Sequence, residues 1–439
     1  MNAFIARKIH AAAIIFILLA SFSCRLEGAE EKTDPAPITD PAPESPAPEE
    51  AIVKVVSGAR VVTGGWADHA NGGTGVSYMN PASITFITDG LFPAAKNKRI
   101  AFTGAIYSSV DAPRIIVVEG DIDLSDALIS DTDKTAYTEF SASGNRLHND
   151  IVYPISSNTT IIGVQNARIM FGGLKINAEK NIIIRNLTFY DAHGSTAQDT
   201  GTYPDSKASI DALSVEGSSA TIWVDHCTFT DGLCSDLVRN LNHDGAFDIK
   251  QGQNITVSWC EFTNHDKVML VGSDDTNYTL ASERQITLHH NYFHGTTQRT
   301  PRSRGCQMHI YNNYYDNIGI AENTGSCLGP GISSQYIVEN NNFGSRLGPI
   351  VKYYDKTTSP AIDTFSLFYH AGNTPAITAA DCTFDTSTDY MKDFSAHVSA
   401  VKPWVVPYSY TLEGSTLLPG ELPSHAGSRQ TVSVNGKTY

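Results

Sequence analysis

Acidic and basic residues gather between residues 244 and 304 of this sequence of 439 residues. Asp244 and Asp248 stand in D-G-A-F-D, Lys267 follows, and three arginines lie in R-T-P-R-S-R (299–304). Paired carboxylates suit a hard cation such as Ca²⁺, and clustered arginine and lysine suit an anionic ligand. The combination indicates a site that handles an acidic substrate across a metal ion.

Short β-branched runs that could position these residues recur from residue 158 onward, and each ends in an aromatic residue. The closing aromatics are Phe189, Phe229, Phe262, Phe293, Tyr315 and Phe343. From Phe229 on they are 33, 31, 22 and 28 residues apart, which suits the turns of a parallel β-solenoid with loops of varying length. Helical periodicity is largely missing, so we predict an all-β solenoid.

Stacked coils should align equivalent residues into ladders, because parallel strands lie about 4.8 Å apart. Two positions before the aromatics stand Leu187, Cys227, Cys260, Asn291, Asn313 and Asn341. The asparagine amides are expected to bond from coil to coil. Cys227 and Cys260 fall on adjacent coils, within reach of a disulfide by spacing alone. Disulfides and buried thiols both remain open.

Three runs align by their alternation and a closing glycine, and this alignment gathers the charged residues. The runs are Leu213-Val215-Gly217, Phe247-Ile249-Gly252 and Val268-Leu270-Gly272. Asp211 then lies two residues before the first run, Asp248 lies inside the second, and Lys267 directly precedes the third. Because side chains alternate along a strand, Asp248 should face solvent while Phe247 and Ile249 face the core.

The first 51 residues are predicted to stand apart from the solenoid. Residues 1–24 place basic residues before a short apolar run, as in an export signal. They end in S-F-S-C, which resembles the lipobox of bacterial lipoproteins and would make Cys24 the lipidated residue; secretion with cleavage further on is the alternative. Residues 25–51 are rich in proline and glutamate and predict a solvated tether. Residues 52–439 form the third predicted unit, the solenoid domain.

The net charge and the spacing of the cysteines argue against some kinds of partner and metal site. The net charge is −15, which argues against nucleic acid as a partner, although a locally basic cleft can still take an acidic substrate. The cysteines after Cys24 lack the C-x-x-C spacing of a zinc site. We expect an exported monomer that is secreted or anchored to the outer face of a bacterial membrane by lipid alone.

Several ordered motifs together resemble one enzyme family. They are W-V-D-H (223–226), D-G-A-F-D-I-K (244–250), V-S-W-C-E-F-x-x-H-D-K (257–267) and R-T-P-R-S-R-G (299–305). The chain is similar, over nearly everything from residue 52 onward, to the polysaccharide lyases that cleave pectate and pectin. This resemblance implies a right-handed parallel β-helix and eliminative cleavage of α-1,4-linked polygalacturonate to 4,5-unsaturated ends.

The resemblance also implies a calcium cofactor. The calcium-binding carboxylates of the family fall on Asp211, Asp244 and Asp248. Some members carry a further acidic ligand where this chain has Ser209. Ca²⁺ takes six to eight oxygen ligands, so substrate carboxylate and water would complete the shell.

The basic residues receive roles in the same way. Arg299 matches the arginine that removes the proton, Lys267 matches a supporting catalytic lysine, and Arg304 matches a substrate-binding arginine. Arg302 ranks below Arg304 for substrate binding, because it could serve as a solvated charge or an ion-pair partner. A guanidinium normally stays protonated in proteins, so an arginine base favours an alkaline optimum.

Two alternatives to a pectate lyase remain. A pectin lyase acting on methyl-esterified chains would not need the calcium carboxylates, and Asp211, Asp244 and Asp248 argue for the pectate side. A non-catalytic β-helix that binds polysaccharide would not need Arg299 or Lys267. A glycoside hydrolase fits less well, because hydrolysis uses two flanking carboxylic acids and these aspartates are assigned to metal.

Overall fold

The computed structural model describes residues 65–67, 70, 83–109, 111–124, 152–192, 210–232, 243–273, 281–319, 325–346, 348–354, 366–385, 393–434 and 437–438. The chain divides into two compact units, Met1–Ser45 and Pro46–Tyr439. All described residues belong to the second unit. The predictions for residues 1–51, including Cys24, and for Ser209 lie outside the described residues.

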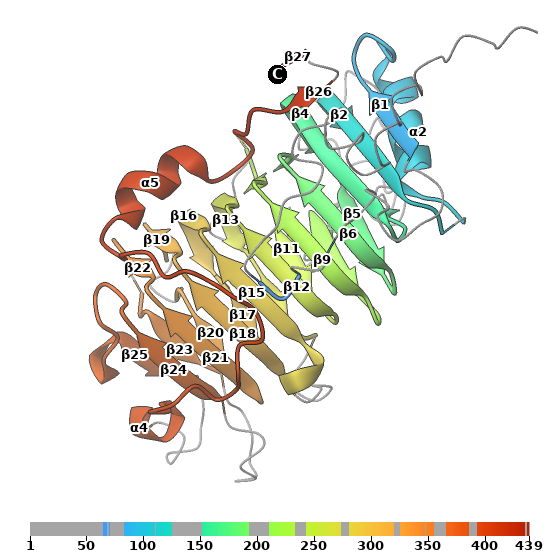
Figure 1. Ribbon diagram of the computed structural model, residues 1–439. Coiled ribbons are helices and arrows are strands. Elements are labelled where there is room, and N and C mark those ends of the chain that lie inside the picture. Colours follow the sequence, from blue (N-terminus) through green and yellow to red (C-terminus); the bar gives the residue numbers. More distant parts are fainter. Residues whose placement is uncertain are drawn as a thin grey trace, which may run out of the picture. The chain divides into compact units, whose positions relative to one another are not determined.

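The strands stack in parallel into three columns (Figure 1). The first column runs through β1 (Ser83–Ile87), β2 (Arg114–Asp123), β4 (Thr159–Met170), β6 (Lys180–Arg185), β9 (Ala220–Asp225), β12 (Gln253–Ser258), β15 (Gln285–His289), β18 (Cys306–Tyr311), β21 (Ser334–Glu339) and β24 (Leu367–Ala371). The second column starts on the paired ends of β2 and β4 and continues through β7 (Thr188–Tyr190), β10 (Thr228–Thr230), β13 (Glu261–Lys267), β16 (Tyr292–Gln298), β19 (Tyr314–Asp316) and β22 (Asn342–Phe343).

The third column carries the predicted site. It consists of β3 (Val152–Pro154), β5 (Gly173–Asn177), β8 (Leu213–Glu216), β11 (Phe247–Ile249), β14 (Leu270–Val271), β17 (Arg302–Ser303) and β20 (Gly329–Pro330). Each coil of the chain visits the third, first and second columns in turn, as β8, β9 and β10 do before β11 begins the next coil. The predicted all-β, parallel β-helix fold is therefore confirmed.

Aromatic rings and asparagines fill the core as the sequence predicts. The rings of Phe189, Phe229, Phe262, Phe293, Tyr315 and Phe343 stack in succession, with centroids 4.7–5.0 Å apart. The amide of Asn291 donates to Asn313, that of Asn313 to Asn341, and that of Asn341 to Asn373, at 2.9, 2.9 and 3.1 Å. The ladder thus runs one residue further than predicted, to Asn373.

The cysteines on the ladder are thiols. All five cysteines of the described part of the chain are free and buried. The Cys227 backbone N–H donates to the Cys260 sulfur at 3.4 Å. The predicted positions of Cys227 and Cys260 on adjacent coils are confirmed. Of the two alternatives, a disulfide or buried thiols, this pair forms buried thiols.

One part of the predicted alignment is wrong by a single residue. Leu213 pairs with Phe247 as predicted, but Ile249 pairs with Val271 and not with Leu270. The closing glycines caused this error, because Gly272 follows Val271 directly, whereas Gly217 stands two residues after Val215. Leu270 consequently lies beside Asp248 on the outer face of the third column.

The remaining described elements are helices, 3-10 turns and strands of two small sheets. They are α2 (Ala95–Ile106), α4 (Phe394–His397), α5 (Leu418–His425), the 3-10 turns η3 (Ala281–Glu283) and η5 (Ala379–Asp381), and strands β23 (Val351–Tyr353), β25 (Cys382–Phe384), β26 (Ser433–Val434) and β27 (Lys437–Thr438). Phe102 and Ile106 of α2 are buried in the core at the first coils. Among the described helices, none combines the length and apolar character that a membrane crossing requires.

The C-terminal segment, residues 401–432, returns along the stack beside the turns between the first and second columns (Figure 1). Asn340 donates its amide to the Glu413 carbonyl at 2.8 Å, and the Glu413 N–H donates to Asn312 at 3.2 Å. Near the other end, the Gln430 N–H donates to Asn186 at 2.9 Å. The segment therefore joins coils that lie far apart in the stack.

Candidate active site

Strand register places the predicted site residues on the outer face of the third column. Asp248 of β11 aligns with Leu270 of β14, because their neighbours Ile249 and Val271 pair, and Leu270 pairs with Arg302 of β17. Asp248 and Arg302 thus occupy one row, two coils apart, or about 10 Å at the usual strand spacing. Charges that are distant in sequence lie on the same wall, as predicted.

Gly245 brings two of the carboxylates together. The Gly245 N–H donates to Asp211 Oδ1 at 3.0 Å. A Cβ added at Gly245 would lie 2.4 Å from Asp248 Oδ1 and 2.8 Å from Asp211 Oδ1, so both oxygens flank the same point. The absence of a side chain at this position lets the two carboxylates approach each other. The Leu270 N–H holds Asp248 Oδ1 from the other side at 2.9 Å.

The two buried carboxylates destabilise each other. Burial raises the pKa of Asp248 well above its usual value, and the nearby charges of Asp211 and Asp244 raise it further, against the Leu270 N–H and Arg299. Burial also raises the pKa of Asp211, partly offset by Lys250 and reinforced by Asp244. A bound cation would relieve this repulsion.

Asp244 differs from the other two aspartates because it already has a cationic partner. Lys267 Nζ donates to Asp244 Oδ1 at 2.6 Å, with the lysine side chain 5% exposed and the aspartate side chain 31% exposed. The backbones of Gly245 and Lys267 also form a bridge. The predicted metal ligand and the predicted catalytic lysine therefore form one ion pair.

The three aspartates suit a hard cation but do not supply a complete coordination shell. Asp211, Asp244 and Asp248 supply carboxylate oxygens, the ligands that calcium prefers. Within the described ranges, no three His, Cys, Asp or Glu side chains lie close enough together to hold a metal ion by themselves. Asp211, Asp244 and Asp248 would therefore bind calcium together with further oxygen ligands. The carboxylate of Asp244 would then lie between the calcium ion and the ammonium of Lys267.

Arg299 follows directly after β16 and faces this cluster. Its backbone has φ of +61°, and its carbonyl accepts the Met269 N–H at 2.7 Å. Its Nε is buried and has no hydrogen-bond partner in the part of the chain that is described. Burial raises the pKa of both Asp248 and Asp266, and the charge of Arg299 opposes part of this rise. Arg299 has no ion-pair partner among the described residues, so its guanidinium keeps donors for a ligand.

The other two predicted arginines differ in their surroundings. The Arg302 guanidinium carbon lies 3.9 Å from the centre of the Tyr354 ring, and Lys352 Nζ lies 5.1 Å from the same ring. Arg302 is thus packed on an aromatic side chain and is not simply a solvated charge. Arg304 is 7% exposed and donates to the Gly272 carbonyl at 3.3 Å.

Two residues near the three aspartates, Lys250 and His265, received no role from the sequence. Lys250 Nζ lies 3.1 Å from Asp211 Oδ2 and 3.1 Å from Glu216 Oε1. The signal was available, because Lys250 stands two residues after Asp248 and shares its face of the strand. His265 was the second omission; its ring bonds Asp231 at 2.5 Å. Burial lowers the pKa of His265, but Asp231 outweighs burial and the net shift is upward.

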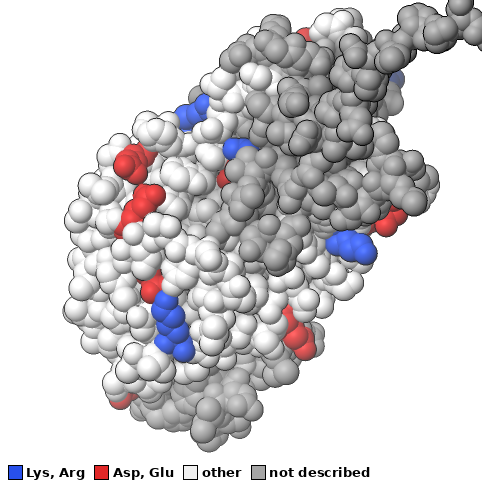
Figure 2. Space-filling model, viewed as in Figure 1, with Lys and Arg blue, Asp and Glu red and all other residues white. Residues whose placement is uncertain are grey.

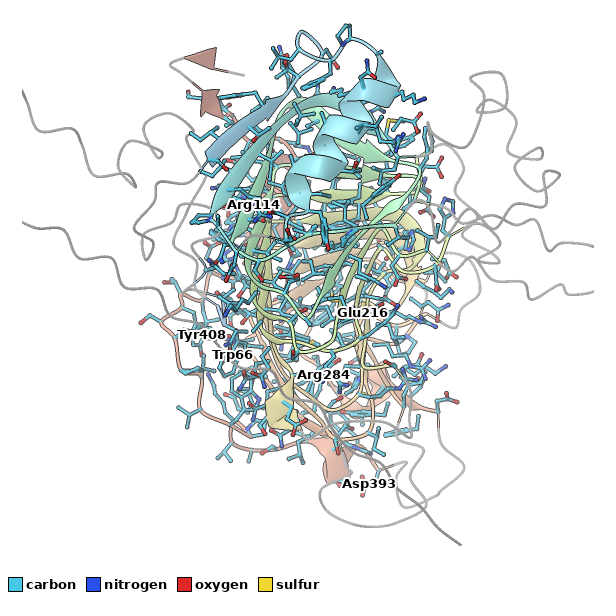
Figure 3. The ribbon with its side chains drawn as sticks, turned by 90° about the vertical axis from the view of Figure 1, so that its right-hand side faces the viewer. Trp66, Arg114, Glu216, Arg284, Asp393 and Tyr408 are labelled. Carbon is cyan, nitrogen blue, oxygen red and sulfur yellow. The ribbon has the colours of Figure 1, made fainter. Side chains whose placement is uncertain are left out.

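Figure 2 shows the face that carries the C-terminal segment, on which the described acidic and basic residues lie singly or in small groups among uncharged ones. In the end-on view of Figure 3, Glu216 of the third column lies on the opposite side of the coils from Trp66 and Tyr408. The two sides differ in how their charges are paired.

A cavity of about 390 Å³ lies on the other side, between the first column and the C-terminal segment. Its lining includes Asp225 and His226 of the W-V-D-H motif. Asp225 is paired with Arg185 at 2.9 Å and with His226 at 2.7 Å, and it accepts the Ser258 hydroxyl at 2.6 Å. These contacts within the protein indicate a structural role for Asp225 and His226.

Comparison with known proteins decides the family. The profile of one family, described as pectate lyase, matches residues 51–431. The chain belongs to the pectate lyase family. The predicted resemblance is thereby confirmed, and so is the prediction that the chain is an enzyme of this family.

Individual pectate lyases show how far the likeness extends. Pectate lyase E of Dickeya chrysanthemi is 30% identical over 86% of this chain and 89% of its own length. A pectate trisaccharide-lyase of Thermotoga maritima is 42% identical, but over 37% of this chain and only 40% of the relative's length. The solved structure of a thermostable pectate lyase aligns with a TM-score of 0.60 and 26% identity, over 85% of this chain and 99% of that one.

Proposed function

We propose that this protein cleaves α-1,4-polygalacturonate by β-elimination, with calcium as cofactor, and releases 4,5-unsaturated oligogalacturonates. The observation that carries the proposal is the placement of two mutually repelling buried carboxylates, Asp211 and Asp248, beside a guanidinium, Arg299, whose Nε has no hydrogen-bond partner in the described structure. Membership of the pectate lyase family supports the same reaction.

The difficult step is removal of the proton at C5 of galacturonate. The electron pair left behind adds negative charge to the adjacent C6 carboxylate, which is already anionic. Calcium bound to that carboxylate would offset the charge, and Asp211, Asp244 and Asp248 would be its ligands. The second cation at this place is Lys267, and its nearness to Asp244 supports a role as a partner of the substrate carboxylate.

In this proposal Arg299, in the neutral form of its side chain, accepts the C5 proton. The electron pair of the C5–H bond forms the C4–C5 double bond, and the C4–O bond breaks. The departing oxygen takes up a proton from solvent, and Arg299 returns its proton to solvent. No water is consumed. Arg302 and Arg304 lie on the same wall further along the stack and would bind carboxylates of neighbouring sugar units.

The setting of the reaction is also proposed. A chain that degrades a large extracellular polymer has to be exported, which agrees with a signal in residues 1–24 and with Cys24 as a lipid attachment site. Residues 25–51 would hold the domain of residues 52–439 away from the membrane. The domain would act as a monomer on the polygalacturonate chain.

The test uses polygalacturonate with the protein and Ca²⁺, followed by excess chelator, while the ultraviolet absorbance of unsaturated ends is recorded. Absorbance that rises with calcium and stops with chelator is the expected result. No absorbance under either condition would favour a polysaccharide-binding protein. Absorbance that chelator leaves unchanged, and that increases on methyl-esterified pectin, would favour a pectin lyase.

A further inference from the structure

A buried chain of alternating acids and imidazoles runs beneath the candidate site. Asp191 bonds His243 Nε2 at 2.8 Å, His243 Nδ1 lies 3.5 Å from Asp231, and Asp231 bonds His265 Nδ1 at 2.5 Å. All four residues are at most 4% exposed. Asp191 and Asp231 follow β7 and β10, and His265 lies in β13, so the chain crosses consecutive coils.

The chain of acids and imidazoles ends on the backbone of two site residues. His265 Nε2 lies 2.9 Å from the Asp244 carbonyl oxygen and 3.1 Å from that of Lys267. Because carbonyl oxygens can only accept, His265 Nε2 must carry a proton and donate to them. The imidazole thus fixes the main chain of both residues, whose side chains form the 2.6 Å ion pair.

The next coil along the stack has no imidazole at the position of His265. In the next coil, Thr296 of β16 pairs with His265 in the strand register. Thr296 is fully buried, and its hydroxyl has no hydrogen-bond partner in the described structure. A coil of this β-helix therefore does not need an imidazole here. Burying two acids and two imidazoles is unfavourable unless their contacts are well made, which points to a task beyond packing.

We propose that His265, held by Asp231, is a positioning residue that sets the distance between Lys267 and the calcium ligand Asp244. This inference rests on the proposed function, since it gives those two residues their tasks. Without the imidazole, the Asp244 and Lys267 carbonyls would turn away from each other. Both calcium binding and turnover would then weaken.

Two substitutions at His265 test the hydrogen bonds of its two ring nitrogens separately. Asparagine can place an amide near Nδ1 and keep a donor towards Asp231, while glutamine can place one near Nε2 and keep the donor to the Asp244 carbonyl. For His265→Asn we expect turnover about 10- to 100-fold lower and half-saturating calcium about tenfold higher, as for other residues that orient metal ligands. His265→Gln should recover most of both losses.

The control is an imidazole with an equally buried acid partner away from the site. His309 Nε2 lies 3.2 Å from Glu339 in the first column, and His309 is fully buried. His309→Gln should lower the melting temperature and leave turnover and calcium dependence unchanged. Terbium luminescence, titrated on each protein without substrate, reports cation binding independently of activity.

The outcomes distinguish this inference from the proposed function. If wild-type protein binds terbium but releases no unsaturated ends, the proposed function fails, and the order of terbium affinities among the variants still tests His265. If His265→Asn loses only stability, as His309→Gln does, and keeps its cation affinity and turnover, the positioning role is wrong. Should His265→Asn fail to fold, Asp231→Asn takes its place with the same expected losses in cation affinity and turnover.

Discussion

The outer faces of the first and third columns treat buried acids in opposite ways. On the first column, burial raises the pKa of Glu339, but hydrogen bonds from His309, Lys402 and Tyr410 outweigh it and hold the pKa at about 2. On the third column, burial raises the pKa of both Asp211 and Asp248, and the charges of neighbouring aspartates raise it further. Acids satisfied by the protein itself stabilise the fold. Acids left repelling one another are the ones that can bind something else.

The largest effect should follow a change to the guanidinium on the third-column face. Arg299→Lys keeps the positive charge but loses the planar group, and turnover should fall at least ~100-fold, or ~2.7 kcal/mol in activation free energy. Steady-state kinetics on polygalacturonate measures this. Arg168→Lys, which alters an exposed arginine paired with Asp121, should retain wild-type turnover. Retention of more than about a tenth of turnover by Arg299→Lys would remove the assigned role.

The next effect concerns stability on the first-column face. Glu339→Gln removes a charge that Lys402 contacts at 2.9 Å and His309 at 3.2 Å, and should lower the free energy of unfolding at pH 7 by about 2 kcal/mol. The pKa of Glu339 is lowered from 4.5 to about 2 on folding, so its contribution is present above pH 4.5 and disappears as the pH falls towards 2. Denaturant melts should therefore show wild type and variant converging in acid; a constant difference would contradict the pairing.

A smaller effect of opposite sign is expected on the third-column face. Asp248→Asn keeps an oxygen for the Leu270 N–H but removes a buried charge that its neighbours repel. Without calcium the variant should melt at a higher temperature than wild type. Its half-saturating calcium should rise about tenfold, or ~1.4 kcal/mol. A lower melting temperature in chelator would show that the carboxylates do not repel each other.

The smallest effect is assigned to Lys250. Its ammonium neutralises part of the charge of Asp211, so Lys250→Met should tighten calcium binding by about fivefold, or ~1 kcal/mol. Isothermal titration calorimetry of the two proteins measures the change. Lys175→Met is the matched control, because Lys175 contacts Glu216 at 3.3 Å and, among the described residues, does not contact the aspartates. Weaker calcium binding by Lys250→Met would mean that the lysine orders Asp211.

Repetition explains what the sequence could predict. The aromatic stack and the ladder from Asn291 to Asn341 follow from residue type and coil spacing alone, since every coil repeats the same contact. The convergence of Asp211 and Asp248 follows from strand alternation. Each of these features needs only the period of the chain.

The failures occur where the period is interrupted. Gly272 follows Val271 directly, whereas Gly217 stands two residues after Val215, so Leu270 and not Met269 lies beside Asp248. His265 could not be assigned because its partner Asp231 and its acceptor Asp244 belong to the preceding coil and the loop after it, and their distance depends on how that loop returns. Contacts between residues on either side of loops of unequal length cannot be predicted from the spacing of residues in the sequence.

The returning C-terminal segment has a consequence for how the molecule unfolds. A stack of coils in which each coil contacts only its neighbours can fray from either end, one coil at a time. Hydrogen bonds from residues 413 and 430 reach Asn312 and Asn186, so an early coil cannot open without releasing a late segment. The segment couples the coils into one cooperative unit. That coupling is complete only once residue 430 has been synthesised.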